Sequence, residues 1–276
     1  MLQKVPDNTT KAIILARGLG SRMREDADVL LTEQQAQTAS RGLKAMINVG
    51  RPFLDYILYR LVEVGINQVC LVVGPEHTEI REYYQNVCRP KRLHIHFAIQ
   101  KEPDGTADAL LAARPFAEQD SVIVLNADNL YPIEALERLN HKPVAAMVGF
   151  NRQSLIDTSN IPPERIRHFA ACELNTDGTL AAIHEKPSDE LMIQLTGMEL
   201  ISMNCWRFKP SIFKACMGIE YSERGELELT DAVNFDIKHH GMRYQVYPCD
   251  KSVLDLSYRK DIQTVTEILK DVEVSL

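Results

Sequence analysis

The sequence predicts an α/β protein with a mainly parallel sheet that helices cover on both faces. Through the first half of the chain, short runs that are apolar along their whole length alternate with amphipathic stretches of helical periodicity. A strand that is apolar on both sides is typical of a parallel sheet buried between helices. Because the two patterns alternate repeatedly, strands connected by helices are the simplest explanation.

Each element of the first half follows from its own residues. The run KAIILA at 11–16 and the later apolar runs are short and bounded by polar residues or glycine, as strands are. The stretch 52–65 has apolar residues at helical spacing and stops at Gly65, a residue type that commonly ends helices. The expected strands are 11–16, 67–74, 93–100 and 121–128, and the expected helices are 52–65, 77–87 and 106–116. A short helix from Thr32 to Ser40 is also expected.

The second half of the chain is less regular. Residues 175–178, Asn-Thr-Asp-Gly, favour a turn. The expected strands are 144–150, 168–175, 200–208 and 244–250, and the expected helices are 209–219, 228–241 and 259–272. The rhythm of the elements changes near residue 140, and no internal repeat accompanies this change.

Length and composition limit the class of protein. The chain of 276 residues is long enough to bury a substantial core, and we expect one domain over residues 1–276. Hydrophobic residues make up 45% and charged residues 25%, the balance of a globular protein. The net charge of −7 argues against a nucleic-acid partner, because proteins that bind phosphate backbones are usually basic. A small anionic substrate stays open, since it needs only local positive charge.

Targeting signals and cysteine pairs are not evident. No apolar run approaches the length of a membrane-spanning helix, and residues 1–11 have no apolar core of the kind that a secretion signal needs. None of the cysteines forms a C-x-x-C pair, so we expect reduced thiols, most of them buried, in a cytoplasmic protein without a membrane partner. The cysteines are Cys70, Cys88, Cys172, Cys205, Cys216 and Cys249.

A glycine-bearing turn, LARGLGSRM at 15–23, follows the first expected strand directly. Gly18 and Gly20 allow the backbone to turn tightly and to approach a ligand, and successive N–H groups in such a turn can hold an anion. Arg22 adds a charged donor suited to phosphate. The dinucleotide-binding alternative requires a third glycine where Met23 stands, and no G-K-[ST] follows for a P-loop. Taken alone, a plain strand-to-helix turn explains the glycines equally well.

The turn is the first of an ordered set of motifs. It is followed by KAMINVGRPFLDYIL (44–58), QKEPDGTADALLAA (100–113), NADN (126–129), HEKP (184–187), MNCWRF (203–208), ELELTDAV (226–233) and VLDLSYRKDI (253–262). In order and spacing this set resembles the sugar-1-phosphate nucleotidylyltransferases, which join a nucleoside triphosphate to a sugar 1-phosphate and release pyrophosphate. The resemblance extends from about residue 11 to 265.

The resemblance implies a fold and a division of labour. The fold is a Rossmann-like three-layer α/β/α sandwich with a mixed, mainly parallel central sheet. Residues 11–140 would form the nucleotide-binding half and residues 141–265 the sugar-phosphate-binding half, with a C-terminal helix over 259–272. The substrates would be an NTP and a sugar 1-phosphate, and a homo-oligomer remains compatible with the sequence.

The resemblance also implies a donor site for the triphosphate. The phosphates would lie against the turn, with Arg22 and Lys44 contacting them as catalytic cations; a solvated lysine is the commoner state of a residue such as Lys44. The base would be recognised by Gln100 and Gly105, and an amide can pair with several base edges, so Gln100 does not name the base. The full set of implied nucleotide-binding residues is Ala16, Gly18, Leu19, Gly20, Ser21, Gln100, Gly105, Thr106 and Asn126.

The metal site implied by the resemblance consists of Asp128 and Asp255, which would hold Mg²⁺. Asp128 ends an apolar strand, where ligands of open α/β sheets bind. Magnesium takes few protein carboxylates and completes its shell with phosphates and water. The residues alone also allow Asp128 to be a strand-end turn residue and Asp255 to be a surface acid.

On the acceptor side, the resemblance assigns Lys186 to the sugar phosphate as a third catalytic cation. It assigns Glu185 to the sugar hydroxyls and Asn204 to sugar contact. The residues alone equally allow Glu185 and Lys186 to form an exposed ion pair. Glu226, Glu228 and Asp231 match an acidic family pattern, but a helix N-terminus with first-turn acids explains them at least as well.

Several residues depart from the family pattern. Arg17 stands where a small residue is usual, and it could change how the base is held or add a phosphate contact. Ala45 replaces a proline, and Cys205 and Trp206 occupy the region of the sugar motif. We therefore keep two alternatives: transfer to a cyclitol, polyol or alcohol phosphate, and a binding protein with a degraded site. The second predicts loss of Arg22, Lys186 or an aspartate, and all are present.

Overall fold

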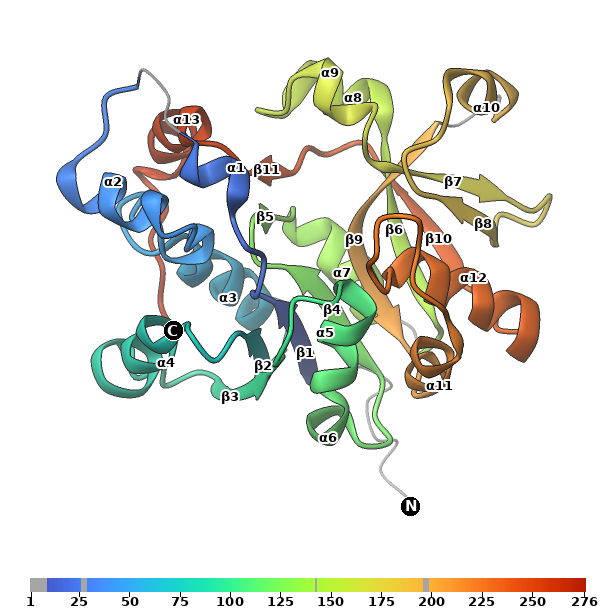
Figure 1. The fold of residues 1–276 in the computed structure, drawn as a ribbon, viewed down its shortest axis with the longest axis horizontal. Helices are drawn as coiled ribbons and strands as arrows, with labels where there is room; N and C mark the ends of the chain where they lie inside the picture. The colour runs from blue at the N-terminus through green and yellow to red at the C-terminus, as the bar shows by residue number, and fades with distance from the viewer. Residues whose placement is uncertain (1–8, 26–28, 142, 196–198) are drawn as a thin grey trace.

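A computed structural model describes residues 9–25, 29–141, 143–195 and 199–276 of the chain (Figure 1). Residues 1–8, where a secretion signal would begin, lie outside the described residues. The strands are β1 (Lys11–Leu15), β2 (Gln68–Val73), β3 (His94–Ile99), β4 (Val122–Asn126), β5 (Asn129–Leu130), β6 (Ala146–Asn151), β7 (Ala170–Leu174), β8 (Leu180–His184), β9 (Leu200–Phe208), β10 (Gln245–Cys249) and β11 (Leu254–Asp255).

The main sheet is mixed and mainly parallel along its path, as predicted. Its strand order is β10-β6-β9-β4-β1-β2-β3, with β7 joined to β9 and β8 joined to β7. The pairs β1–β2, β1–β4, β2–β3 and β6–β10 are parallel, whereas β9 runs antiparallel to β4, β6 and β7. The antiparallel β9 lies between β4 and β6, and β5 and β11 form a separate two-stranded ribbon.

Helices pack on both faces of the sheet and complete three layers (Figure 1). Neighbouring strand residues point to opposite faces, so Ile13 belongs to one hydrophobic cluster and Ile14 to the other. The helices are α1 (Ser21–Arg24), α2 (Glu33–Ser40), α3 (Phe53–Glu63), α4 (Thr78–Glu82), α5 (Thr106–Ala112), α6 (Arg114–Ala117), α7 (Ile133–His141), α8 (Arg152–Thr158), α9 (Pro163–Ile166), α10 (Asp189–Gln194), α11 (Ser211–Gly218), α12 (Leu229–His240) and α13 (Arg259–Leu269). Helices α3, α7 and α13 bury their apolar sides in the cluster of Ile14, and α5, α11 and α12 bury theirs in the cluster of Ile13.

The expected elements are present, and most differ only at their ends by a few residues. The single helix expected over 106–116 is wrong: it is interrupted at Ala113 and forms α5 and α6, because Pro115 cannot donate the hydrogen bond that would continue α5. The short helix predicted over Thr32–Ser40 is α2, with Thr32 as N-cap: its hydroxyl accepts a hydrogen bond from the backbone N–H of Gln35 at 3.2 Å. The helix expected over 77–87 changes after Glu82 into a π-helical turn, η2 (Tyr83–Cys88). Tyr84 belongs to the hydrophobic cluster of Ile14 and Tyr83 packs against it, which confirms both as packing residues. Both also donate to the buried Asp55 carboxylate, at 2.9 and 2.8 Å.

Several short elements were not predicted. The helices α7, α8, α9 and α10 and the strand β8 lie between or beyond the expected runs. The β8 sequence, LAAIH, has two alanines and little β-branching, so its strand character comes from pairing with β7 rather than from propensity. Helices α8 and α9 occupy a stretch interrupted by Pro162 and Pro163, which hides any long periodicity.

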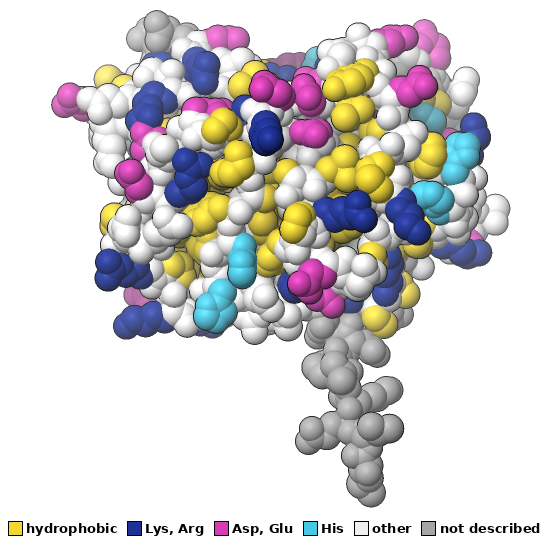
Figure 2. Space-filling model, turned by 60° about the horizontal axis from the view of Figure 1, so that its bottom comes forward, with side chains coloured by type: hydrophobic (Ala, Val, Ile, Leu, Met, Phe, Trp, Pro, Cys, Tyr) yellow, Lys and Arg dark blue, Asp and Glu magenta, His cyan; other side chains and the backbone are white. Residues whose placement is uncertain are grey.

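The surface and the cysteines agree with the composition. On the face shown in Figure 2, basic and acidic side chains are interspersed around hydrophobic ones, and the basic side chains do not form a continuous surface. All the cysteines are free thiols; Cys88 is partly exposed and the others are buried. None of the helices in the described residues is long and apolar enough to cross a membrane.

Candidate active site

A cleft of about 410 Å³ lies at the carboxyl ends of the neighbouring parallel strands β4, β1, β2 and β3. Parallel strands present their carboxyl ends at one edge of the sheet, which is where open α/β sheets bind ligands. The cleft is lined by all the predicted nucleotide-binding residues, Ala16, Gly18, Leu19, Gly20, Ser21, Gln100, Gly105, Thr106 and Asn126, and by Arg22, Lys44 and Asp128. The structure therefore brings the predicted donor-side residues together in one concave site.

The glycine-bearing turn follows β1 and leads into α1. Gly20 has φ +62°, and a Cβ built on it would lie 2.2 Å from the carbonyl oxygen of Gly42. Gly42 has φ +74°, and a Cβ there would lie 2.4 Å from the carbonyl oxygen of Leu19. Both positions thus require glycine, because the two backbones touch and both φ angles are left-handed. Gly42 lines the cleft and was not singled out from the sequence, since its partner is distant along the chain.

Lys44 and Asp128 both line the cleft and form an ion pair between the Lys44 Nζ and the Asp128 Oδ2. Lys44 begins the 3₁₀ turn η1 (Lys44–Met46), and Asp128 lies in the turn between β4 and β5. The two side chains are 20% and 22% exposed, so a ligand in the cleft can reach both. A cation and a carboxylate held side by side can serve a polyphosphate and its metal at once.

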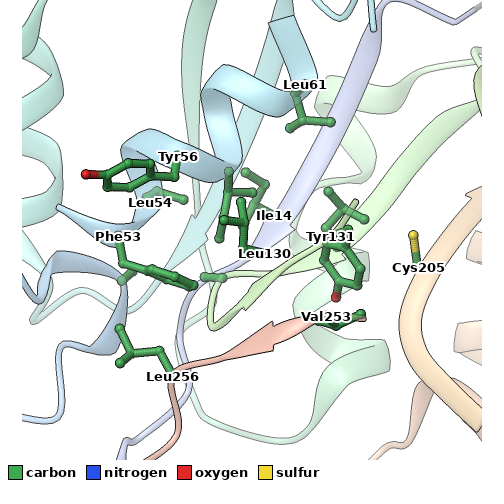
Figure 3. Packing of buried hydrophobic residues seen from close by; sticks show 14 of the residues in the cluster. Ile14, Phe53, Leu54, Tyr56, Leu61, Leu130, Tyr131, Cys205, Val253 and Leu256 are labelled. Carbon is green, nitrogen blue, oxygen red and sulfur yellow. The ribbon is translucent and has the colours of Figure 1, made fainter. Parts of the chain in front are cut away.

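Asp255 lies next to Asp128 although the two are far apart in the sequence. Strand β11 pairs antiparallel with β5, which places Asp255 opposite Asn129, and the N–H of Leu256 donates to the carbonyl of Asp128 at 2.9 Å. The ribbon is held by packing: Leu130, Val253 and Leu256 lie among the hydrophobic side chains that Figure 3 shows. The pairing of β11 with β5 thus brings Asp255 close to Asp128, which the residues of the sequence alone could not predict.

The Asp255 carboxylate is buried and densely bonded. It pairs with the Arg165 guanidinium and accepts hydrogen bonds from Asn129 Nδ2 at 3.0 Å and Ser257 Oγ at 3.1 Å. Burial raises the pKa of Asp255 to about 6, and repulsion from the Asp128 carboxylate adds to this rise while Arg165 opposes it. Two neighbouring carboxylates that repel one another fit a divalent cation, which would relieve the repulsion.

The types of side chain available as metal ligands limit which cation fits the site. Among the described residues, no group of three or more His, Cys, Asp or Glu side chains could hold a metal alone. Magnesium requires only one or two carboxylates when phosphates and water fill its shell. The pair Asp128 and Asp255 therefore fits Mg²⁺ bound together with a nucleotide better than a permanently bound transition metal.

Gln100, Gly105 and Thr106 lie on the opposite side of the cleft. The Gln100 Nε2 donates to the carbonyl of Gly105 at 3.0 Å and to the Asp108 carboxylate at 2.9 Å, which fixes the amide. Gly105 has φ +109°, and a Cβ there would lie 2.5 Å from the carbonyl oxygen of Leu227. The Thr106 hydroxyl accepts from the N–H of Leu229 at 2.9 Å, so it holds the start of α12 in place.

The acceptor-side residues do not line this cleft. Lys186 follows β8 with φ +45°, and Asn204 lies within β9 with φ +54°. Left-handed backbone at non-glycine residues is uncommon and concentrates at functional sites, so the conformation of these two residues agrees with the sequence prediction of a site there. The indole N–H of Trp206 donates to the Asn204 side-chain oxygen at 3.2 Å, which orients that amide.

The departures Cys205 and Trp206 lie in the core rather than on the acceptor wall. Both are fully buried, and Trp206 stacks on Phe208 with ring centroids 5.3 Å apart. Trp206 is thus a packing residue, as one interpretation of the sequence held, and it acts on the site only through Asn204. These two residues give no ground for expecting an unusual acceptor.

Arg224, which belongs to none of the sequence motifs, lies among the acidic residues predicted for the acceptor side. Arg224 pairs with Glu228 and lies 3.7 Å from Glu185. Burial and repulsion from Glu228 raise the pKa of Glu185. Glu228 is the residue before α12 and Asp231 lies in its first turn, as the helix interpretation of these acids expected, while Glu226 lines the cleft. Arg165 was missed for the same reason as Arg224: both act through residues distant in sequence.

Comparison with known proteins identifies the family. The family model described as nucleotidyl transferase matches residues 11–270. The UTP–glucose-1-phosphate uridylyltransferase AglF of Haloferax volcanii is 26% identical over 266 residues, which cover 95% of this chain and 97% of that protein. The bifunctional protein GlmU of Methanococcus maripaludis is 31% identical over 240 residues, and the match spans 86% of this chain but only half of GlmU.

The solved structures agree on the fold. A UDP-glucose pyrophosphorylase in complex with UDP-glucose superposes with a TM-score of 0.72 at 15% identity, over 95% of this chain and 98% of that one. Because the family model matches nearly the whole length, the chain belongs to the nucleotidyl transferase family, among the sugar-1-phosphate nucleotidylyltransferases.

Proposed function

We propose that this enzyme binds an NTP in the cleft between the glycine turn and Gln100 and transfers its nucleotidyl group to a sugar 1-phosphate with the aid of Mg²⁺. The observation that carries the proposal is that Lys44 and Asp128 line the cleft beside the turn at Gly18–Arg22. The buried Asp255 adjoins Asp128 through the pairing of β11 with β5 and does not itself line the cleft. A triphosphate needs donors and cations, and its metal needs carboxylates, and this edge of the sheet supplies both.

The reaction requires that two anionic substrates be held close together, with the attacking oxygen in line with the leaving pyrophosphate. An oxygen of the sugar phosphate attacks the α-phosphorus, and pyrophosphate leaves from the opposite side. Arg22 and Lys44 neutralise phosphate charge, and the backbone of the turn orients the triphosphate. When bound by Asp128 and Asp255, Mg²⁺ supplies further charge neutralisation. No covalent intermediate with the protein is needed, because positioning and electrostatics provide the acceleration.

Lys186, Glu185 and Asn204 bind the acceptor. Residues 11–140 bind the NTP, and residues 141–265 bind the sugar phosphate.

Lys186→Gln should raise KM for the sugar phosphate about 10- to 100-fold, because a phosphate loses a charged partner, while KM for the NTP changes less than about threefold. Steady-state kinetics with each substrate varied in turn measures the two values. The control Lys238→Gln, in the last turn of α12, should change neither. Equal changes in both KM values would contradict the assignment.

Pyrophosphate release tests the function as a whole. Five NTPs are paired with a panel of sugar 1-phosphates and a cyclitol phosphate, with and without Mg²⁺. The named relatives make UTP and glucose 1-phosphate the first pair to test. We expect release that requires the NTP, the acceptor and the metal together. Release from NTP alone, or none with any pair, would contradict the proposal.

The raised pKa of Asp255 predicts how magnesium binding depends on pH. Above about pH 6 the carboxylate is ionised and available to the cation; below that value a proton competes for it. The affinity for Mg²⁺ should therefore fall about tenfold per pH unit below pH 6. Calorimetric titration of the nucleotide-free protein with Mg²⁺ between pH 5 and 8 measures this without interference from the NTP phosphates. The variant Asp255→Asn should bind more weakly and lose the pH dependence; a flat wild-type profile would refute the expectation.

A further inference from the structure

Arg17, the residue that departs from the family pattern in the glycine turn, is buried in the wall of the nucleotide cleft. Its side chain is 7% exposed and lines the cleft. The Nη2 donates to the carbonyl of Lys101 at 3.0 Å and lies 3.5 Å from the Glu76 carboxylate. Among the described residues no acceptor reaches its Nε and Nη1, although both atoms are buried. A charged donor group left partly unsatisfied inside a ligand site indicates that the ligand supplies the missing acceptor.

The position of the guanidinium decides which part of the nucleotide it meets. Glu76 follows β2 and Lys101 follows β3, so the Arg17 side chain extends away from β4 toward the β3 edge of the sheet. Lys44 and Asp128 lie on the other side of β1, where β4 ends. The Glu76 carboxylate would also repel a phosphate placed beside Arg17. The guanidinium thus faces the base end of the cleft rather than the phosphate end.

Gln100 completes the hydrogen-bonding pattern at that end. Its Nε2 is occupied by Gly105 and Asp108, and in the part of the chain that the structure describes no donor reaches its Oε1. Gln100 therefore offers an acceptor to the cleft, whereas Arg17 offers only donors. A base that presents an N–H and a carbonyl oxygen satisfies both. Uracil, thymine, guanine and cytosine carry a carbonyl oxygen, and adenine carries none.

We propose that Arg17 is a specificity-determining residue that donates to a carbonyl oxygen of the nucleobase and so selects against ATP. The inference rests on the proposed function, because it assumes that the cleft holds an NTP. In the free enzyme the Glu76 carboxylate attracts the guanidinium from 3.5 Å. It therefore competes with the base carbonyl, which accepts from the unsatisfied Nε or Nη1. Arg17 occupies a position that usually carries a small side chain, and there it selects among the donor nucleotides.

The test compares NTP selectivity in matched variants. Arg17→Met keeps the bulk of the side chain and removes its donors. For the best carbonyl-bearing NTP, kcat/KM should fall about 10- to 100-fold, while kcat/KM for ATP stays within about threefold, so the selectivity ratio collapses. Arg81→Met is the control. Arg81 donates to the carbonyls of Gly74 and Pro75, which directly precede Glu76, but it does not line the cleft. It should keep the wild-type ratio.

Each outcome decides the matter. An unchanged ratio in Arg17→Met would make Arg17 a packing residue, and an equal fall for all five NTPs would make it a phosphate or structural contact; both overturn the inference. If Arg17→Met does not fold, Glu76→Gln serves instead, since Glu76 is about half exposed. Removing the competing carboxylate should raise the ratio about threefold, and an unchanged or lower ratio overturns the inference. If wild-type enzyme releases no pyrophosphate with any pair, the proposed function fails, and calorimetric NTP binding to the same variants decides the role of Arg17 separately.

Discussion

Replacing Asp128 with asparagine should lower kcat/KM for nucleotidyl transfer about 1,000-fold. Asparagine keeps the shape of the side chain and removes the negative charge, so the proposed Mg²⁺ site loses one of its two carboxylates and Lys44 loses its partner. The loss of metal-dependent charge stabilisation in the transition state gives this magnitude. Steady-state kinetics at saturating Mg²⁺ measures the effect, and a raised Mg²⁺ requirement should accompany it.

The control for this variant lies at the other end of the same strand. Asp120 precedes β4, is 58% exposed and pairs with Lys11, far from the cleft edge. Asp120→Asn should retain nearly full activity, because an exposed ion pair contributes little to stability. A wild-type rate in Asp128→Asn would show that Asp128 does not bind the metal. Equal losses of activity in both variants would indicate a general effect on folding.

Replacing Gly20 with alanine should lower kcat/KM for the NTP at least about 100-fold and lower the free energy of unfolding by about 2–4 kcal/mol. The new Cβ would lie 2.2 Å from the carbonyl oxygen of Gly42, and the φ of +62° disfavours any side chain. The turn and the Gly42 segment must therefore separate, which displaces the backbone that lines the cleft beside Lys44, where we propose that the phosphates bind. Urea unfolding and NTP kinetics report the two effects.

Gly18 provides a matched control within the same turn. No atom lies within 4 Å of a Cβ built on Gly18, and its φ is not left-handed. Gly18→Ala should therefore leave the stability nearly unchanged and should affect catalysis only through direct contact with the nucleotide. If Gly20→Ala is as stable as Gly18→Ala, the close approach of the two backbone segments does not constrain the turn as the structure indicates.

The fold was largely readable from the sequence because buried strands and amphipathic helices leave long patterns. Strand β4 is apolar throughout and ends at Asn126, so the position of Asp128 at the edge of the sheet followed from the sequence. The elements β8 and α9 were not readable: β8 lacks the apolar, β-branched run that marks β1 and β4, and α9 has four residues, too few to show a helical period. The antiparallel direction of β9 was equally hidden, since a strand's own residues do not encode its orientation.

The site was readable where its residues belong to one turn and not where it is assembled across the chain. Gly18, Gly20 and Arg22 lie in one stretch of sequence, so the sequence already grouped them, and all three line the cleft. Asp255 alone resembled a surface acid, and only its pairing with β5 brings it beside Asp128. Arg165 was invisible for a related reason: it pairs with Asp255 from a helix of four residues, and no local pattern marks it.

Phosphorus-31 NMR of the reaction of the best NTP and sugar 1-phosphate tests the central claim most directly. In the presence of Mg²⁺ we expect the signals of both substrates to decline together while those of a phosphodiester-linked NDP-sugar and of free pyrophosphate grow in equal amounts. Omission of the sugar phosphate or of Mg²⁺ should abolish the change. Formation of orthophosphate, or of a nucleoside monophosphate without the NDP-sugar, would show that the enzyme hydrolyses the nucleotide and would contradict nucleotidyl transfer.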